Sequence, residues 1–236
     1  VRREILSVLD GIIARMSNWE ADSDLSRFNR APIGEWQTLP ADLLEVIQAG
    51  LYVARASGGA FDPAIGAIVQ RWGFGPPGSV APVPLLSGRP WQAIEIDGVR
   101  ARRMADVALD LSGIAKGFAV DAVAERLNAL GLRHYLVEIG GELRGAGVKP
   151  DGQPFWVDLE TPPGLSVPTM RVALCGLSVA TSGDYRRYRD EGDRRLSHTI
   201  DPATGAPIDN RVASVSVLHE SAMLADAWAT AIGVLG

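Results

Sequence analysis

An acidic residue and a hydroxyl residue stand four positions apart in SAMLADAWATAIGVLG (221–236). An α-helix turns about 100° per residue, so Asp226 and Thr230 would lie on one side of it. The apolar stripe lies nearly opposite and consists of Leu224, Trp228, Ala231 and Leu235. Two oxygen ligands on one rigid face suit Mg²⁺, with a backbone carbonyl, water and a substrate phosphate completing an octahedron. A solvent-exposed polar face fits the same spacing, and these two residues alone favour that interpretation.

Lysine is rare in this chain, and one of its two lysines lies at a turn of distinctive composition. The segment ALDLSGIAKGFAVD (108–121) predicts a strand, a turn with Asp110, Gly113 and Lys116, and the start of a helix. Backbone amides at a helix N-terminus, together with a lysine, suit a phosphate group. The named nucleotide motifs G-x-G-x-x-G and G-x-x-x-x-G-K-[ST] do not apply. A tight turn with a solvated lysine is the alternative, and this segment alone favours it.

The histidine at position 198 lies in RRLSHTIDPATGAPID (194–209), where a strand-like approach ends in Asp-Pro and Thr-Gly turn signals. A histidine on such a turn suits a general base near neutral pH. An exposed or capping His198 is the commoner explanation. The nearby stretch VATSGDYRRYRD (179–190) fits an anion site, a partner surface, or a polar turn followed by a solvated strand.

Two further segments carry aromatic residues beside polar ones. MSNWEADSDLSRFN (16–29) ends a helix and presents Trp19, which suits stacking on a flat ligand or ordinary packing. GGAFDPAIGAIVQRWGFG (58–75) contains Phe61 and Asp62 and by itself predicts a well-defined turn. The glycine cluster GGELRGAG (140–147) predicts a hairpin or a bulge.

The elements that must position these residues follow an order typical of an α+β fold. Helical periodicity predicts helices over 4–17, 41–57 and 117–130, the last ending at Gly131, and a further one from about Ser221. β-type runs cover 93–96, 105–111, 135–139, 155–159, 170–174 and 212–218. Strict βαβ alternation is absent, and the Pro/Gly-rich loop 73–90 is too short to separate two domains. We therefore expect one domain over 1–236, with mixed β-sheets flanked by helices.

Composition excludes several classes of protein. The 236 residues include 23 basic and 28 acidic side chains, giving a net charge of −5, and 47% are hydrophobic, which argues against disorder and weakly against nucleic acid. One cysteine and three histidines cannot build a zinc finger, an iron–sulfur site or a disulfide framework. A metal would have to be hard and oxygen-liganded. The chain opens without methionine and stops inside an apolar helical pattern, so we expect truncation at both ends.

Taken together, the sequence resembles the ApbE family of FAD:protein FMN transferases. Six stretches carry the resemblance, in family order and across nearly the whole chain. They are MSNWEADSDLSRFN, GAFDPAIGAIVQRWGFG, DLSGIAKGFAVD with YLVEIGGELRGAG, ATSGDYRRY, SHTIDPATGAPI and LADAWATAIGVLG. Each motif is weak alone, but the ordered set outweighs the local alternatives given above.

The resemblance implies a role for each matching position. Asp226, Thr230 and the backbone carbonyl of Gly113 match magnesium ligands, and His198 matches a catalytic histidine, most plausibly a base. Trp19 matches an aromatic placed against the flavin. The remaining FAD-contacting positions match Ala60, Phe61, Asp62, Asp110, Lys116 and Ile200.

The implied reaction is Mg²⁺-dependent transfer of FMN from FAD to a threonine or serine hydroxyl of an acceptor protein, with release of AMP. The expected acceptor carries a D-x-x-[ST]-G-A-[ST]-like segment, as in a redox-pump subunit. The alternatives are a Mg²⁺-dependent FAD pyrophosphatase, in which water replaces the hydroxyl, and a non-catalytic FAD-binding protein. A periplasmic or cell-envelope location, through a lipid anchor upstream of this chain, is also implied by resemblance.

Overall fold

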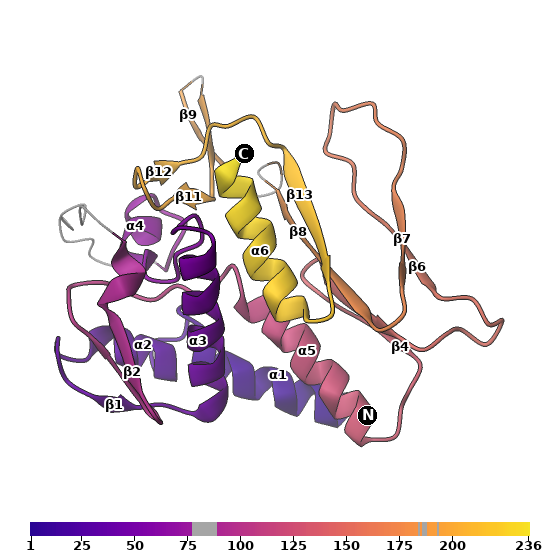
Figure 1. Cartoon of the computed structure of the whole chain (residues 1–236), viewed down its shortest axis with the longest axis horizontal. Helices are drawn as coiled ribbons and strands as arrows, with labels where there is room; N and C mark the ends of the chain where they lie inside the picture. Colours follow the sequence, from indigo (N-terminus) through magenta and orange to yellow (C-terminus); the bar gives the residue numbers. More distant parts are fainter. Residues whose placement is uncertain (77–88, 184, 186–187, 193) are drawn as a thin grey trace.

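A four-stranded antiparallel sheet and two helices packed on it form the centre of the computed structural model (Figure 1), which describes residues 1–76, 89–183, 185, 188–192 and 194–236. The sheet has the strand order β13 (Ser214–His219), β8 (Leu177–Gly183), β5 (Glu142–Ala146) and β4 (Tyr135–Ile139). Helix α5 (Ala115–Ala129) packs on β4 and β5, and α6 (Ala222–Leu235) packs on β8 and β13. The two helices also contact each other.

The crossing of α5 and α6 depends on a glycine. A Cβ at Gly117 would lie 2.2 Å from the backbone oxygen of Ala222, so any side chain there would force the helices apart. The carboxylate of Asp121, one turn further along α5, accepts hydrogen bonds from the N–H groups of Ala222 (3.0 Å) and Met223 (3.0 Å). These contacts fix the N-terminus of α6 against α5.

The N-terminal half adds a second layer of helices. It contains α1 (Arg2–Met16), α2 (Asp24–Arg30), α3 (Ala41–Ala56) and α4 (Gly66–Arg71), with a three-stranded sheet in the order β1 (Gln37–Thr38), β3 (Arg100–Arg103) and β2 (Ile94–Asp97), preceded by the short 3₁₀ helix η1 (Pro90–Ala93). Buried residues from both halves form one hydrophobic cluster, in which Phe28 and Ile47 pack with Ile114 and with Ala227 of α6. The shared core joins the two layers into a single α+β domain, as predicted.

Three two-stranded sheets complete the described structure. They pair β6 (Phe155–Asp158) with β7 (Arg171–Leu174), β9 (Tyr188–Glu191) with β10 (Arg194–Ser197), and β11 (Ile200–Asp201) with β12 (Ala206–Pro207). Figure 1 shows β6 and β7 as an arm beside the main sheet. Within the described ranges, no helix has the length and apolar character that crossing a membrane requires.

Most predicted elements are confirmed to within two residues at each end, including the turn at 140–141 between β4 and β5. The strand predicted over 105–111 is wrong. Its backbone is held by a loop and a side chain instead of a neighbouring strand: Gly66 N–H donates to the Ala108 oxygen (2.8 Å), and Asn29 bonds both the N–H and the C=O of Leu109 (2.8 Å each). The central strand β8 and the short elements α2, α4, β1 and β3 were not predicted. Residues 77–88 of the predicted loop lie outside the described residues.

Candidate active site

A cavity of about 480 Å³, called here the central cavity, opens where the start of α5, the middle of α6 and the end of β8 meet. Ten of the eleven residues predicted for the site line it. They are Ala60, Phe61, Asp62, Asp110, Gly113, Lys116, His198, Ile200, Asp226 and Thr230. The structure thus brings together residues that are up to 170 positions apart in the sequence (60 to 230).

A lysine and two buried carboxylates form the charged centre of the central cavity. The Lys116 Nζ pairs with Glu142 Oε1 and lies 3.6 Å from Asp226 Oδ1. Asp226 and Glu142 are only 3% and 2% exposed. The N–H of Gly117, in the first turn of α5, donates to Asp226 Oδ2 (3.1 Å). Asp226 is therefore buried inside the site, and the exposed polar face that Asp226 and Thr230 favoured when considered alone is not formed.

The three charged groups of this cluster shift one another's pKa values. Burial lowers the pKa of Lys116, but the neighbouring charges of Asp226 and Glu142 outweigh that effect and raise it, so the ammonium group is retained. Burial, together with the charge of Asp226, raises the pKa of Glu142 to about 7. Burial also raises the pKa of Asp226, against the opposing effect of Lys116. Two buried acids and one partly exposed cation leave an acidic excess, which suits binding of a further cation.

Two oxygen-bearing residues lie beside Asp226. Thr230 follows it by one helical turn, and its Oγ1 lies 3.2 Å from Ser182 Oγ at the end of β8. A Cβ at Gly113 would lie 3.1 Å from Thr230 Oγ1, so the Gly113 backbone closely approaches this hydroxyl. Glu142 Oε2 is buried and has no hydrogen-bond partner within the described structure. A carboxylate, a hydroxyl and a nearby backbone carbonyl are the hard oxygen donors that Mg²⁺ prefers, so the predicted ligand set fits the ion chemically.

The predicted magnesium ligand set does not require a cluster of acidic or histidine side chains. Among the described residues, no group of three or more His, Cys, Asp or Glu side chains is placed to hold a metal. A magnesium site here would use one carboxylate and complete its octahedron with neutral oxygens, water and substrate phosphate.

Two other carboxylates in the central cavity are held by backbone amides. Asp62 accepts hydrogen bonds from the N–H groups of Ala64 (2.8 Å) and Trp91 (3.1 Å). Burial nevertheless raises its pKa to about 6, since desolvation outweighs both hydrogen bonds. Asp110 accepts from the Ser112 N–H (2.8 Å) and from Asn18 Nδ2 (3.2 Å).

His198 lies on the turn between β10 and β11, where the sequence predicted it. Its ring is half-buried, and it meets the ring of Phe74 edge to face with a centroid separation of 6.4 Å. The adjacent Ile200 is buried in β11. The imidazole therefore lines the central cavity, next to an aromatic ring.

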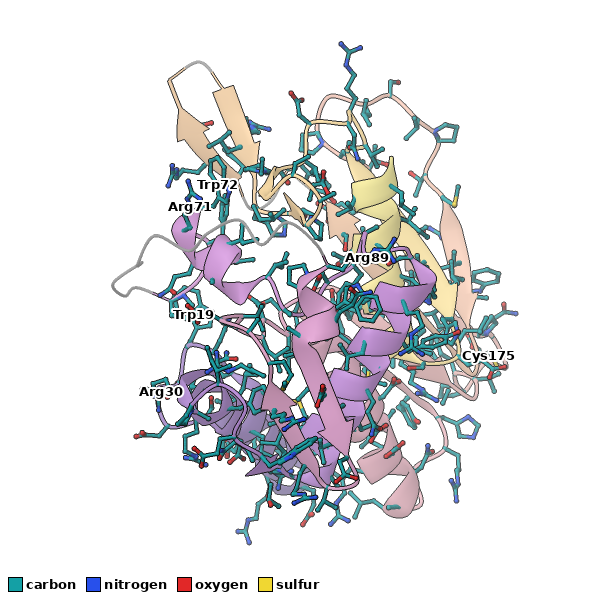
Figure 2. The ribbon with its side chains drawn as sticks, turned by 60° about the vertical axis from the view of Figure 1, so that its left-hand side comes forward. Trp19, Arg30, Arg71, Trp72, Arg89 and Cys175 are labelled. Atoms are coloured by element: carbon teal, nitrogen blue, oxygen red, sulfur yellow. The ribbon has the colours of Figure 1, made fainter. Side chains whose placement is uncertain are left out.

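Trp19 is the predicted site residue that the structure leaves out of the cavity lining. Its side chain is 55% exposed on the turn between α1 and α2 (Figure 2). Its neighbour Asn18 bonds Asp110, so Trp19 lies one residue from the rim. A flavin contact by Trp19 stays a prediction.

Sequence reasoning missed several lining residues, above all Glu142 and Ser182. The stretch containing Glu142 was interpreted as a hairpin or a bulge and as part of a family motif, with no role given to Glu142 itself. An acidic residue directly after a glycine pair, at the start of a strand of that hairpin, was the available signal. Ser182 carries no comparable signal, because its role arises from contact with a helix residue 48 positions away.

The fold is that of solved flavin transferases. A Pseudomonas stutzeri flavinyl transferase ApbE in its apo form is 40% identical, with a TM-score of 0.89 over 100% of this chain and 76% of that one. The flavin transferase ApbE from Vibrio cholerae is 37% identical, with the same TM-score, over 100% and 78%.

Sequence comparison agrees with the structural one. The sequence profile of the ApbE family matches residues 1–236, and the chain belongs to that family. An FAD:protein FMN transferase from Haemophilus influenzae is 36% identical over 99% of this chain and 72% of its own length. That of Vibrio cholerae is 38% identical over 100% and 73%.

Proposed function

We propose that this protein is an FAD:protein FMN transferase, which moves FMN from FAD to a threonine or serine hydroxyl of an acceptor protein and releases AMP. The observation that carries the proposal is the convergence of ten predicted site residues on one cavity. The relatives named above supply the substrate class, since they are FAD:protein FMN transferases.

The reaction is a phosphoryl-type transfer. The acceptor oxygen bonds to the FMN-side phosphorus of FAD, the bond from that phosphorus to the bridging oxygen breaks, and AMP leaves with the bridging oxygen. In this account His198 accepts the hydroxyl proton, and Lys116 supplies positive charge beside the pyrophosphate. Glu142 keeps the lysine in place through their ion pair. Phe61 and Ile200 provide apolar walls from which water is displaced.

We also propose that Asp226, Thr230 and the Gly113 carbonyl hold Mg²⁺. When bound, the ion would neutralise pyrophosphate charge. Matched Thr230 variants test this assignment: Thr230→Ser retains a hydroxyl, whereas Thr230→Val keeps the shape and loses the oxygen. The magnesium concentration that gives half-maximal activity should rise about tenfold in Thr230→Val and stay near the wild-type value in Thr230→Ser. Equal magnesium dependence in the two variants would contradict it.

The acceptor is proposed to carry a D-x-x-[ST]-G-A-[ST]-like segment, and the location to be periplasmic or cell-envelope. Both proposals rest on the family resemblance alone. The acceptor proposal is tested with peptides in which valine replaces the hydroxyl residue. Labelling of these peptides with flavin should disappear.

One incubation distinguishes the transferase from its alternatives. The protein is mixed with FAD, Mg²⁺ and a peptide containing the acceptor segment, and the peptide is then denatured and examined for flavin fluorescence. Labelled peptide supports the transferase. Free FMN without labelled peptide indicates a pyrophosphatase, and intact bound FAD indicates a binding protein; either result would overturn the proposal.

A further inference from the structure

The end of β8 presents an unpaired edge to the central cavity. β8 pairs with β13 over Ser178–Gly183 but with β5 only over Leu177–Val179. In the part of the chain that the structure describes, no strand pairs with the β5-side edge beyond Val179. Thr181, Ser182 and Gly183 line the central cavity there. The edge is continuous with the candidate site, because Ser182 Oγ lies 3.2 Å from Thr230 Oγ1.

Strand β6 presents a second unpaired edge to the same cavity. Among the described strands it pairs only with β7. The Leu159 N–H donates to the Met170 oxygen (2.8 Å) in the β6–β7 register, so the alternation of an antiparallel pair turns the N–H and C=O groups of Trp156 and Asp158 away from β7.

The central cavity meets this strand along its edge. Val157 and Asp158 of β6 line it, as do residues 159 and 160, which follow the strand. Successive side chains of a strand point to opposite faces, so a cavity against one face would touch only alternate residues. Contact with both Val157 and Asp158 is expected when the cavity runs along the edge. Unpaired backbone groups there are available for hydrogen bonding to another extended chain.

We propose that the segment of the acceptor protein carrying the hydroxyl binds between these two edges, in a slot lined by residues 157–160 and 181–183, as an added strand hydrogen-bonded to the open edge of β6. The proposal rests on the transferase function above and names the surface that its protein substrate uses. Strand addition supplies affinity through main-chain hydrogen bonds. An acceptor segment can therefore be recognised even though few of its side chains are specified. Because the β8 edge leads to Thr230, an extended segment in the slot carries its hydroxyl toward the candidate magnesium and phosphate end.

The arm that carries β6 also offers a surface for the rest of a folded acceptor. Its exposed apolar side chains are Trp156, Leu165, Val167 and Met170. Figure 1 shows this arm beside β8 and β13, away from the N-terminal helices. Exposed apolar side chains on one arm are available for contact with a protein partner.

A matched pair of variants at one position tests the use of the β6 edge. Asp158→Pro removes the outward N–H without removing a β6–β7 hydrogen bond, and proline is tolerated at such an edge position. Asp158→Ala keeps the N–H but loses the same carboxylate and the same ion pair with Arg171, so it sets the baseline. Relative to Asp158→Ala, we expect Asp158→Pro to raise the KM for the acceptor peptide about tenfold, with kcat and the Kd for FAD within about twofold.

A second measurement uses the wild-type protein and therefore does not depend on the folding of a variant. A series of acceptor peptides is prepared, each with one backbone nitrogen methylated. An added strand bonds a given neighbouring edge through alternate residues, so the KM should rise at every second position along the peptide. A uniform effect, or none, would overturn strand addition.

The outcomes separate this proposal from the proposed function. If the wild-type protein labels no peptide, the transferase function is wrong. If it labels the peptide and the two Asp158 variants share one KM, the function stands and strand addition is wrong. If Asp158→Pro weakens FAD binding and leaves the acceptor KM unchanged, the slot holds FAD and the proposal is likewise overturned.

Discussion

Two carboxylates secure helix α6 in different ways. Asp121 reaches its N-terminus from α5 and has partners on every side: the N–H groups of Ala222 and Met223, the Ser221 hydroxyl (2.8 Å) and the Arg144 guanidinium. Asp226, inside the helix, has one backbone donor and a lysine 3.6 Å away, and it faces the central cavity. The fully satisfied carboxylate stabilises the fold, whereas the incompletely satisfied one has binding capacity left for a ligand.

Asp226→Asn should have the largest effect on activity. Asparagine keeps the shape and an oxygen that accepts the Gly117 N–H, but it loses the charge that the proposed magnesium site requires. We expect FMN transfer to fall about 1,000-fold while the thermal unfolding midpoint stays within a few degrees of wild type or rises. Transfer is measured with labelled acceptor and stability by calorimetry. A large loss of stability with activity retained would reverse the roles assigned to the two carboxylates.

Asp121→Ala should have the opposite effect, with a large loss of stability and a smaller change in magnesium binding. Removing this side chain leaves the N–H groups of Ala222 and Met223 and the Arg144 guanidinium without their acceptor, which should lower the free energy of unfolding by about 2–4 kcal/mol. At a temperature where the variant remains folded, the Kd for Mg²⁺ should change less than in Asp226→Asn. Denaturant unfolding and magnesium titration check the two expectations, and an unchanged unfolding free energy would contradict the structural role.

Asp62 is a third carboxylate, which accepts two backbone hydrogen bonds and still has a raised pKa. Burial raises its pKa to about 6, so the protonated form is favoured by folding. Its contribution to stability is present below the ordinary pKa of an aspartic acid and is lost as the pH rises through about 6.

The measurement is the unfolding free energy of wild type minus that of Asp62→Asn, between pH 4 and pH 7. This difference should decrease by up to about 3 kcal/mol as the pH rises, because one pKa unit corresponds to about 1.4 kcal/mol. A constant difference would show that Asp62 titrates normally.

Glu142→Gln should have the smallest effect. Glutamine retains an oxygen that can accept from Lys116 but removes the charge that pairs with it. We expect kcat to fall about tenfold, since the lysine would be less firmly positioned, and FAD binding to weaken less. Steady-state kinetics separate the two quantities. An effect as large as that of Asp226→Asn would indicate that Glu142 itself holds the cation.

The sequence predicted the fold class and the long periodic elements because their apolar spacing is local. It did not predict that residues 105–111 lack a partner strand, because that depends on Asn29, about 80 positions away. For the site, Asp226 and His198 were ambiguous singly, since their residue types also fit exposed surfaces. The ordered family motifs removed that ambiguity, and the structure then revealed the burial of Asp226. Glu142 and Ser182 depend on tertiary contacts, which no local pattern records.

The mass of an acceptor peptide after incubation with FAD and Mg²⁺ tests the transferase function directly. With the wild-type protein, we expect the threonine or serine to gain one FMN minus one water, with release of AMP. Asp226→Asn, or excess EDTA, should abolish the gain. An unmodified peptide with wild type, or the same gain in excess EDTA, would show that the protein is not a magnesium-dependent FMN transferase.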